Sequence, residues 1–299
     1  PDPALPRHFG VEVECGLRSF RGPLPAFLRA WSGSCGTDCS VGDGRRLQRP
    51  PAGYEPVNPD MAVEVRTPPA TGAVARDLIR GLGDALAAHG AHTDSTCGLH
   101  VHVDARGATA DDLARLALVW SRVEGALWNA VAPSRRRNPQ ISRYCSSWGD
   151  AFDRQGVLAA TTTIDKERAI RNARVNPNGQ KYHALNFMPF WSQQTVEIRM
   201  HHGSVNARKI LRWATCMVQI VHWAFTHTDA EARALRGTPS EIVDRLLDRE
   251  HAAWMRRRRE HFASMRSRTG QPPRRPARTV VPQEPVAPIP PDAGDGSEV

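Results

Sequence analysis

The chain has 299 residues, of which 40% are hydrophobic, so it can bury the core of one large domain or two small ones. Its net charge of +9 comes largely from arginine, which suits phosphate or carboxylate partners, although arginine is also simply abundant here. Six cysteines are too few for a disulfide framework, and no apolar run is long enough to span a membrane. With no signal-peptide pattern at the N-terminus, we expect a cytoplasmic protein with reduced thiols.

The first part of the chain predicts two strands and a helix. Residues 1–8 are a Pro-rich lead-in, and residues 9–14 alternate apolar and polar side chains as a half-buried strand does. A second strand is expected over residues 61–67, after a Gly-, Ser- and Pro-rich loop at residues 32–60. Residues 73–89 carry one apolar stripe at helical spacing and therefore predict a helix.

The remaining elements follow the same patterns. After a third strand, Thr109 begins a helix as its capping residue. A strand over residues 181–190 is expected to pair, through a turn, with a strand over residues 195–201. Two helices follow, one over residues 206–227 and one that begins at Thr238 and continues through the arginine run near residue 258.

Four of these strands share one arrangement of charged side chains. Leu99, Val101 and Val103 alternate with histidines and an aspartate, and successive side chains of a strand point to opposite faces. A half-solvated sheet also has a charged face, but these faces hold Glu, His and Arg with hardly any Lys or Thr, which favours a ligand-binding face. The side chains expected there are Glu12, Glu14, Glu64, Arg66, His100, His102, Asp104, Glu197, Arg199 and His201.

The chemistry of this polar face indicates divalent cations. Several carboxylates brought together repel one another, and some take up protons unless cations bind. Oxygen-rich ligation with an imidazole favours Mg²⁺ or Mn²⁺ over Zn²⁺. Arginines beside such ions suit a phosphoryl group. Because the chain has no Walker-type loop and no GxGxxG after a strand, a nucleotide would be held through metals and arginines.

Three motifs, in this order, resemble those of the amidoligase family, which belongs to the glutamine synthetase-like carboxylate–amine ligases. They are Gly10–Glu14, Cys97–Asp104 and Thr195–Arg199. Looser matches are found at residues 31–40, 64–69, 143–145 and 181–186. Within residues 64–69, Arg66 and Thr67 depart from the family pattern. The resemblance covers roughly residues 9–223.

The resemblance implies an α+β fold, in which a twisted, mainly antiparallel sheet carries the site on its concave polar face and is backed by helices. It implies one catalytic domain over residues 9–268, followed by a Pro-rich, basic, disordered tail over residues 269–299. The implied activity is ATP-dependent formation of an amide or isopeptide bond through an acyl phosphate, with release of ADP and phosphate. The carboxylate and amine substrates could be small molecules, peptides or proteins, and related ligases often form homo-oligomers.

By position, the resemblance assigns two sets of metal ligands. Glu12, His100 and Glu197 resemble the ligands of a Mg²⁺ or Mn²⁺ ion that binds the ATP phosphates. Glu14 and Glu64 resemble the ligands of a second ion nearer the acceptor substrate.

Other residues are assigned to the nucleotide and the substrates. Arg199 would neutralise the transferring phosphoryl group, and His102 would lie beside the phosphates. Arg143 and Asn186 are candidates for nucleotide or substrate contacts. Cys145 has no obvious base nearby and is expected to be structural or to contact substrate. The predicted catalytic set is Glu12, Glu14, His100, Glu197 and Arg199.

Two other functions stay open at this point. A metal-dependent hydrolase of amide or phosphate bonds would act without ATP. A non-catalytic binding protein on a ligase scaffold would act through its basic tail, although no recognised nucleic-acid-binding motif is present and we expect no nucleic-acid or membrane partner. The sequence is equally compatible with two positions for His201 and His202. One of them could face the site, or it could cap the helix that begins near Asn206.

Overall fold

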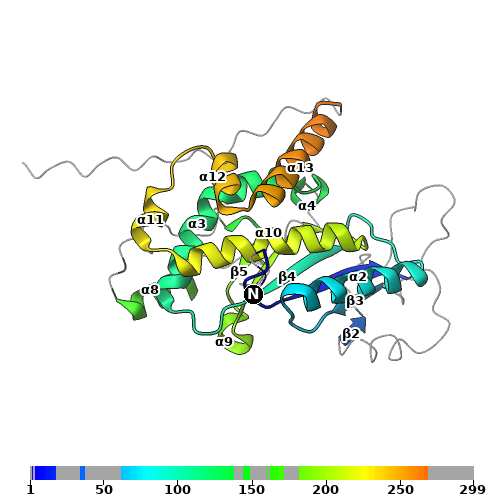
Figure 1. Ribbon diagram of the computed structural model, residues 1–299, viewed down its shortest axis with the longest axis horizontal. Coiled ribbons are helices and arrows are strands. Elements are labelled where there is room, and N and C mark those ends of the chain that lie inside the picture. The colour runs from blue at the N-terminus through cyan, green and yellow to red at the C-terminus, as the bar shows by residue number, and fades with distance from the viewer. Residues whose placement is uncertain are drawn as a thin grey trace, which may run out of the picture.

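Six strands pair antiparallel in the order β2–β3–β1–β4–β6–β5, which places β1 and β4 at the centre of the sheet. The computed structural model describes residues 2, 4–17, 34–37, 62–137, 144–148, 160, 162–171 and 182–268 (Figure 1). The strands are β1 Phe9–Gly16, β2 Ser34–Thr37, β3 Ala62–Arg66, β4 Gly98–Asp104, β5 Leu185–Asn186 and β6 Thr195–His202.

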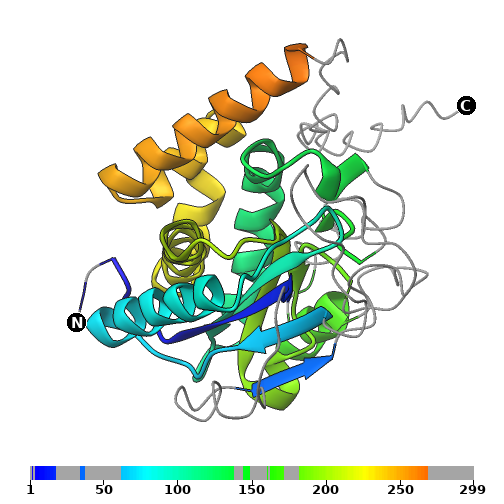
Figure 2. The ribbon, with the colours of Figure 1, turned by 90° about the vertical axis from the view of Figure 1, so that its right-hand side faces the viewer.

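Helices cover one face of this sheet. Figures 1 and 2 show α10 and α2 lying across the sheet, with α12 and α13 farther from it. The contacts agree, because α10 packs on β1 and β4 and also touches α2, α3 and α13. The helices are α2 Gly72–Ala88, α3 Ala110–Asn129, α4 Ser134–Arg137, α8 Thr163–Arg171, α9 Phe190–Gln193, α10 Ala207–Thr226, α11 Asp229–Ala234, α12 Pro239–Leu246 and α13 Arg249–Arg268.

The apolar side chains of the central strands form the core under the helices. Val13, Leu99 and Ile198 are completely buried, as are Trp213 and Met217 of α10. Each such side chain contributes about 1.5–3 kcal/mol through its removal from water. The alternating pattern therefore fixes which face of the sheet is left for polar groups, and the predicted α+β fold with a helix-backed antiparallel sheet is confirmed.

Capping side chains set the starts of the long helices where the sequence predicts them. The Thr109 hydroxyl accepts from the Asp112 amide at 3.2 Å, and the Asp112 carboxylate accepts from the Thr109 amide at 2.8 Å. Asn206 begins α10 in the same way, because its side chain accepts from the Lys209 amide at 3.0 Å. Such caps satisfy amide groups that have no partner within the helix.

Three predicted elements differ in the structure. Residues 34–37, which are predicted to belong to the loop at residues 32–60, form strand β2. They are extended because they pair with β3. Only β5 of the predicted strand 181–190 pairs with β6, and the helical turn α9 follows, ended by Gln194 in the left-handed region at φ 55°. The predicted helix from Thr238 is divided into α12 and α13, because Asp248 caps a new helix by accepting from the His251 amide at 2.9 Å.

A β-bulge between β4 and β6 corrects the prediction for His201. Leu99 pairs with His201 but Val101 pairs with Ile198, so one extra residue of β6 is accommodated opposite β4. His201 therefore turns to the helix side, where it is fully buried with its ring centroid 4.7 Å from that of Trp213. It neither faces the polar side nor caps α10, which Asn206 caps.

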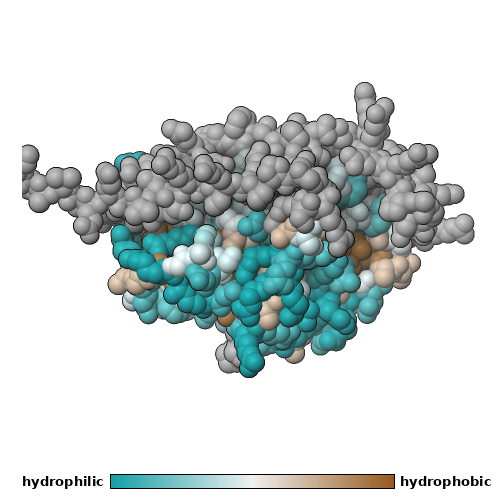
Figure 3. All heavy atoms as spheres, turned by 90° about the horizontal axis from the view of Figure 1, so that it is seen from above, coloured by the Kyte–Doolittle hydropathy of each residue, from teal (hydrophilic) through white to brown (hydrophobic). Residues whose placement is uncertain are grey.

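None of the described helices combines the length and apolar character needed to cross a membrane. Seen from above, the described residues are mostly hydrophilic (Figure 3). The tail at residues 269–299 lies outside the described residues, so its predicted disorder stays a prediction.

The buried His201 and the partly buried His202 lie between the sheet and α13. His202 Nδ1 accepts from the Ala132 amide at 3.1 Å, and Arg258 contacts His201 at 3.3 Å. Burial, and then the charges of Arg258, Arg135 and Lys209, lower the pKa of His202 to about 3. Burial also lowers the pKa of His201. Both rings are therefore neutral in the folded chain at neutral pH.

The lowered pKa of His202 predicts a loss of stability in mild acid. Unfolding returns its pKa to about 6.5, so the unfolded chain binds a proton that the folded chain excludes, and stability falls as pH decreases below that value. At about pH 5 the expected loss from His202 is roughly 2 kcal/mol. Urea unfolding of wild type and His202→Gln at pH 7.5 and 5 checks this, because the variant should lose about 2 kcal/mol less. Equal losses would contradict the prediction.

The close contact between α2 and α10 gives a second prediction. A Cβ on Gly83 would lie 2.5 Å from Ala207 Cβ, whereas a Cβ on the exposed Gly125 of α3 would meet nothing within 4 Å. Gly83→Ala should therefore destabilise the fold by about 1–3 kcal/mol, despite the better helix propensity of alanine. Gly125→Ala is the matched control and should stabilise the fold by up to about 1 kcal/mol. Chemical denaturation of both variants measures the two effects, and a stabilised Gly83→Ala would refute the tight packing.

Candidate functional site

Polar side chains of β1, β3, β4, β5 and β6 lie in cross-strand pairs on the face opposite α10. This arrangement follows from the alternation in each strand and from the antiparallel register. The pairs are Glu14 with Glu64, Glu12 with both Arg66 and His100, and Glu197 with both His102 and Asn186. Predicted residues on five different strands are thereby brought together.

Glu12 lies at the centre of this cluster and contacts three neighbouring side chains. Its Oε2 lies 3.1 Å from His100 Nδ1, and its Oε1 lies 3.1 Å from Arg66 Nε and 3.5 Å from His102 Nε2. Burial acts to raise the pKa of Glu12, but the contacts with both histidines outweigh burial and hold it far below its usual range. Glu12 is therefore an ionised carboxylate at neutral pH.

Glu197 is the most enclosed carboxylate of the cluster, at 3% exposure. Asn186 Nδ2 donates to its Oε2 at 2.6 Å, and Arg199 Nη1 forms an ion pair with its Oε1. Burial raises its pKa, but the charges of Arg199, His100 and His102 more than offset this and lower it. Asn186 thus lies where the sequence predicts, in direct contact with a predicted metal ligand.

Glu14 and Glu64 occupy the other end of the cluster. Glu14 Oε2 accepts from the Gly98 amide at 2.5 Å, and its Oε1 lies 3.4 Å from His100 Nε2. Glu64 pairs with Arg66. Burial, followed by the nearby charge of Glu12, raises the pKa of Glu64 above its usual value. This is the response expected of carboxylates held together without a bound cation.

His102 presents an open nitrogen to two carboxylates. Its Nδ1 lies 3.1 Å from Thr195 Oγ1, which fixes the ring. Its buried Nε2 has no hydrogen-bond partner among the described residues and lies 3.5 Å from Glu12 and 3.7 Å from Glu197. Although burial lowers the pKa of His102, the contacts with these carboxylates raise it overall. An imidazole oriented through one nitrogen and open at the other is typical of a metal ligand.

Two groups of potential metal ligands result. In each group, the ligand atoms lie within 4.8 Å of one another: Glu12, His102 and Glu197 in one, and Glu12, Glu64 and His100 in the other. His102 is thus added to Glu12 and Glu197, while the predicted ligand His100 also lies close to both, with its Nδ1 3.1 Å from Glu12 Oε2 and 3.6 Å from Glu197 Oε1. Glu14 belongs to neither group. The carboxylate-rich donor sets and the open His102 Nε2 fit Mg²⁺ or Mn²⁺.

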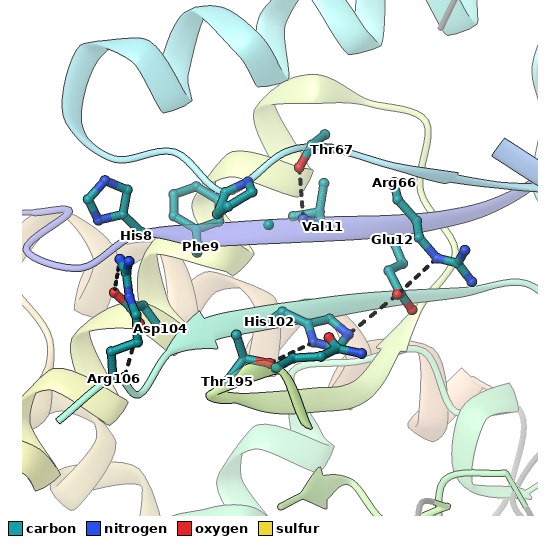
Figure 4. A pocket seen from close by; sticks show the side chains of 13 residues that line it. His8, Phe9, Val11, Glu12, Arg66, Thr67, His102, Asp104, Arg106 and Thr195 are labelled. Carbon is teal, nitrogen blue, oxygen red and sulfur yellow. Dashed lines mark hydrogen bonds and ion pairs between the residues drawn. The ribbon is translucent and has the colours of Figure 1, made fainter. Parts of the chain in front are cut away.

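A pocket of about 380 Å³ opens beside Glu12 and His102. Figure 4 shows these two side chains pointing into the same space from β1 and β4, with Arg66 above them and Thr195 below. The far end of the pocket is bordered by the Asp104–Arg106 ion pair. Its volume is in the range that holds a small organic ligand. Its other lining residues include His8, Phe9, Gly10, Thr67, Pro69 and Gln193.

The remaining sequence candidates lie as follows. Arg143 is outside the described residues. Cys145 is buried, and burial raises the pKa of its thiol to about 11, which makes it a poor nucleophile. Sequence reasoning missed the contact between Thr195 and His102, although Thr195 begins a recognised motif. For the arginine run at residues 135–137, the sequence is compatible with contact to an acidic substrate and with a solvated loop, and the structure buries Arg135 at 3% exposure.

Comparison with known proteins identifies one family and several distant structures. The family model described as "Putative amidoligase enzyme" matches residues 37–221. A crystal structure of a novel glutamine synthase homolog is 14% identical with a TM-score of 0.41, covering 88% of this chain and 67% of that one. No curated protein matches the chain.

Two further structures are similarly distant. A bifunctional glutathione synthetase from Pasteurella multocida is 12% identical with a TM-score of 0.38, covering 89% of this chain and 45% of that one. The complex between the prokaryotic ubiquitin-like protein Pup and its ligase PafA gives 12% identity and a TM-score of 0.33, covering 88% of this chain and 64% of that one. The chain thus spans less than two thirds of the length of both. Since the family model covers more than half of the chain, the protein belongs to the amidoligase family.

Proposed function

We propose that this protein is an ATP-dependent carboxylate–amine ligase that uses Mg²⁺ or Mn²⁺. The observation that carries the proposal is the open His102 Nε2, which is buried, held by Thr195 and turned toward Glu12 and Glu197. A nitrogen in this position beside two ionised carboxylates is suited to a divalent cation. Membership of the amidoligase family supports the reaction class.

The proposed metal ligands are the carboxylates and histidines that cluster on the polar face. Glu12, His102 and Glu197 would hold one ion, and Glu12, Glu64 and His100 would hold another, with Glu14 beside them. When bound, the cations offset the negative charge of nucleotide phosphates. Asn186 and Arg199 hold Glu197 through its two oxygens, which fixes the carboxylate for that task.

In the proposed reaction, an oxygen of the substrate carboxylate forms a bond to the γ-phosphorus of ATP while the bond to the ADP oxygen breaks. The amine nitrogen then bonds to the acyl carbon of the resulting acyl phosphate, phosphate leaves with the electrons of the carbon–oxygen bond, and the amine loses a proton. Arg66 and Arg199 supply positive charge on this face. Guanidinium groups lower the barrier to bringing an anionic carboxylate near an anionic phosphate.

The pocket beside Glu12 and His102 is the proposed entrance for the nucleotide. It opens directly onto one of the two ligand groups, and Arg66 is half-exposed at its side, with 50% of its side chain accessible. The phosphates would therefore meet both a cation site and a guanidinium. The carboxylate and amine substrates, as small molecules, peptides or proteins, are proposed to meet the phosphates over the same face.

Nucleotide binding through the metal ligands is the test of this proposal. Calorimetry should show ATP binding to wild type with Mg²⁺ or Mn²⁺ and at least tenfold weaker binding without them. Glu197→Gln and Glu12→Ala should each lose the metal-dependent part, because both remove a ligand oxygen from the same group. Glu260→Ala, on the exposed side of α13, is the matched control and should bind as wild type does.

Two outcomes would count against the ligase. ATP binding that is unchanged in both site variants would remove the polar face as the nucleotide site. Cleavage of amides or phosphate esters without ATP, lost in Glu197→Gln, would instead assign the cluster to a metal-dependent hydrolase. The melting temperatures of the variants establish that each one is folded under the assay conditions.

A further inference from the structure

Arg135 is a buried guanidinium without a carboxylate partner. Its side chain is 3% exposed, and its Nη2 donates to the Arg199 carbonyl oxygen at 2.9 Å. Its Nε has no hydrogen-bond partner among the described residues, none of whose carboxylates forms an ion pair with it. A charged group in such surroundings is costly unless an anion compensates it.

Other interior arginines of the described chain have evident partners. Arg115 forms ion pairs with Asp112 and Asp229. Arg258 donates to the Ala130 carbonyl at 2.8 Å and lies 5.1 Å from the ring centroids of both Trp254 and Phe262. These contacts explain why such residues are tolerated in the interior. Arg135 lacks an equivalent set and therefore requires a different explanation.

The position of Arg135 connects it to the polar face. A Cβ built on Gly98 would lie 2.9 Å from Arg135 Nη2, 3.0 Å from Glu14 Oε2 and 3.0 Å from His100 Nε2. Three functional side chains thus meet around a glycine that leaves room for them. Gly98 and Asp104 are the two ends of β4, and Asp104 borders the pocket. The Arg135 guanidinium therefore lies at the end of the carboxylate cluster that is farther from Asp104.

A second guanidinium with a free donor lies beside it. The Nε of Arg199 is also buried without a hydrogen-bond partner among the residues described. The two residues are direct neighbours, because Arg135 Nη2 donates to the Arg199 carbonyl oxygen at 2.9 Å. Two unused donors on neighbouring arginines are suited to the oxygens of one oxyanion.

We propose that Arg135, together with Arg199, binds a carboxylate group of the acceptor substrate at the Gly98 end of the polar face. Arg199 is already paired with Glu197, and Arg66 with Glu12 and Glu64, so among the arginines described at this face Arg135 is the one without a carboxylate partner. One unit of charge matches a carboxylate better than a phosphate, which carries about 1.5–2 negative charges at neutral pH. The assignment to the acceptor rests on the proposed ligase function, but the binding site does not.

Saturation-transfer NMR with propionate, in Mg²⁺-containing buffer of fixed ionic strength and without ATP, tests the site. Propionate should bind wild type, and Arg135→Met should raise its dissociation constant at least tenfold, because a charge-assisted contact is lost. Arg135→Lys keeps the positive charge but not the planar guanidinium with its paired N–H donors, so propionate binding should weaken about threefold. Arg258→Met is the matched control: it removes another interior guanidinium and should leave propionate binding unchanged while lowering the melting temperature.

The other outcomes overturn the proposal. The first is that propionate does not bind the wild type, and the second is that it binds Arg135→Met as tightly as the wild type. The third is that inorganic phosphate binds the wild type more tightly than propionate does, and that this phosphate binding is lost in Arg135→Met. If Arg135→Met does not fold, Arg135→Lys decides, and binding equal to wild type counts against the site. Because no ATP is present, a failure of metal-dependent ATP binding would contradict the ligase without altering this result.

Discussion

The electrostatic repulsion among four glutamates on one face of a sheet is the constraint on which this structure depends. Two unit charges 4 Å apart at an effective dielectric constant of 20 interact by roughly 4 kcal/mol, so the cluster is stable only if positive groups are interleaved with it. The sheet provides these groups in register, with His100 and Arg66 opposite Glu12, and His102 opposite Glu197. Burial, and then the charge of Glu12, nevertheless raise the pKa of Glu64. The remaining charge is what a cation would neutralise.

The strand pattern predicted most of this arrangement, because alternation determines the face of every side chain in a regular strand. Glu12, His100 and Glu197 therefore lie where their sequence positions indicate. The same reasoning failed for His201, since Arg199, Met200 and His201 continue the alternation while the bulge inserts one residue opposite β4. A bulge depends on the partner strand and on the packing of Trp213, and neither is contained in the local pattern.

Other features could not be read from the sequence for related reasons. Strand β2 lies in a Gly- and Ser-rich segment with no strand pattern, and it exists through its pairing with β3. Arg135 belongs to a run of three arginines, which usually indicates solvent exposure, but this side chain turns toward the sheet and donates to Arg199. The grouping of metal ligands also depends on cross-strand distances, which bring His102 as well as His100 close to both Glu12 and Glu197.

The position of Glu12 on the central strand has a further consequence for the proposed chemistry. Its Oε1 faces His102 and its Oε2 faces His100, so the two oxygens of one carboxylate are directed at the two ligand groups. Glu64 and Glu197 each belong to only one group. A cation bound by one group would therefore share the Glu12 carboxylate with a cation bound by the other. The affinities of the two groups for cations would thus depend on each other. In the proposed ligase, Glu64 and Glu197 would each serve one cation, whereas Glu12 would serve both.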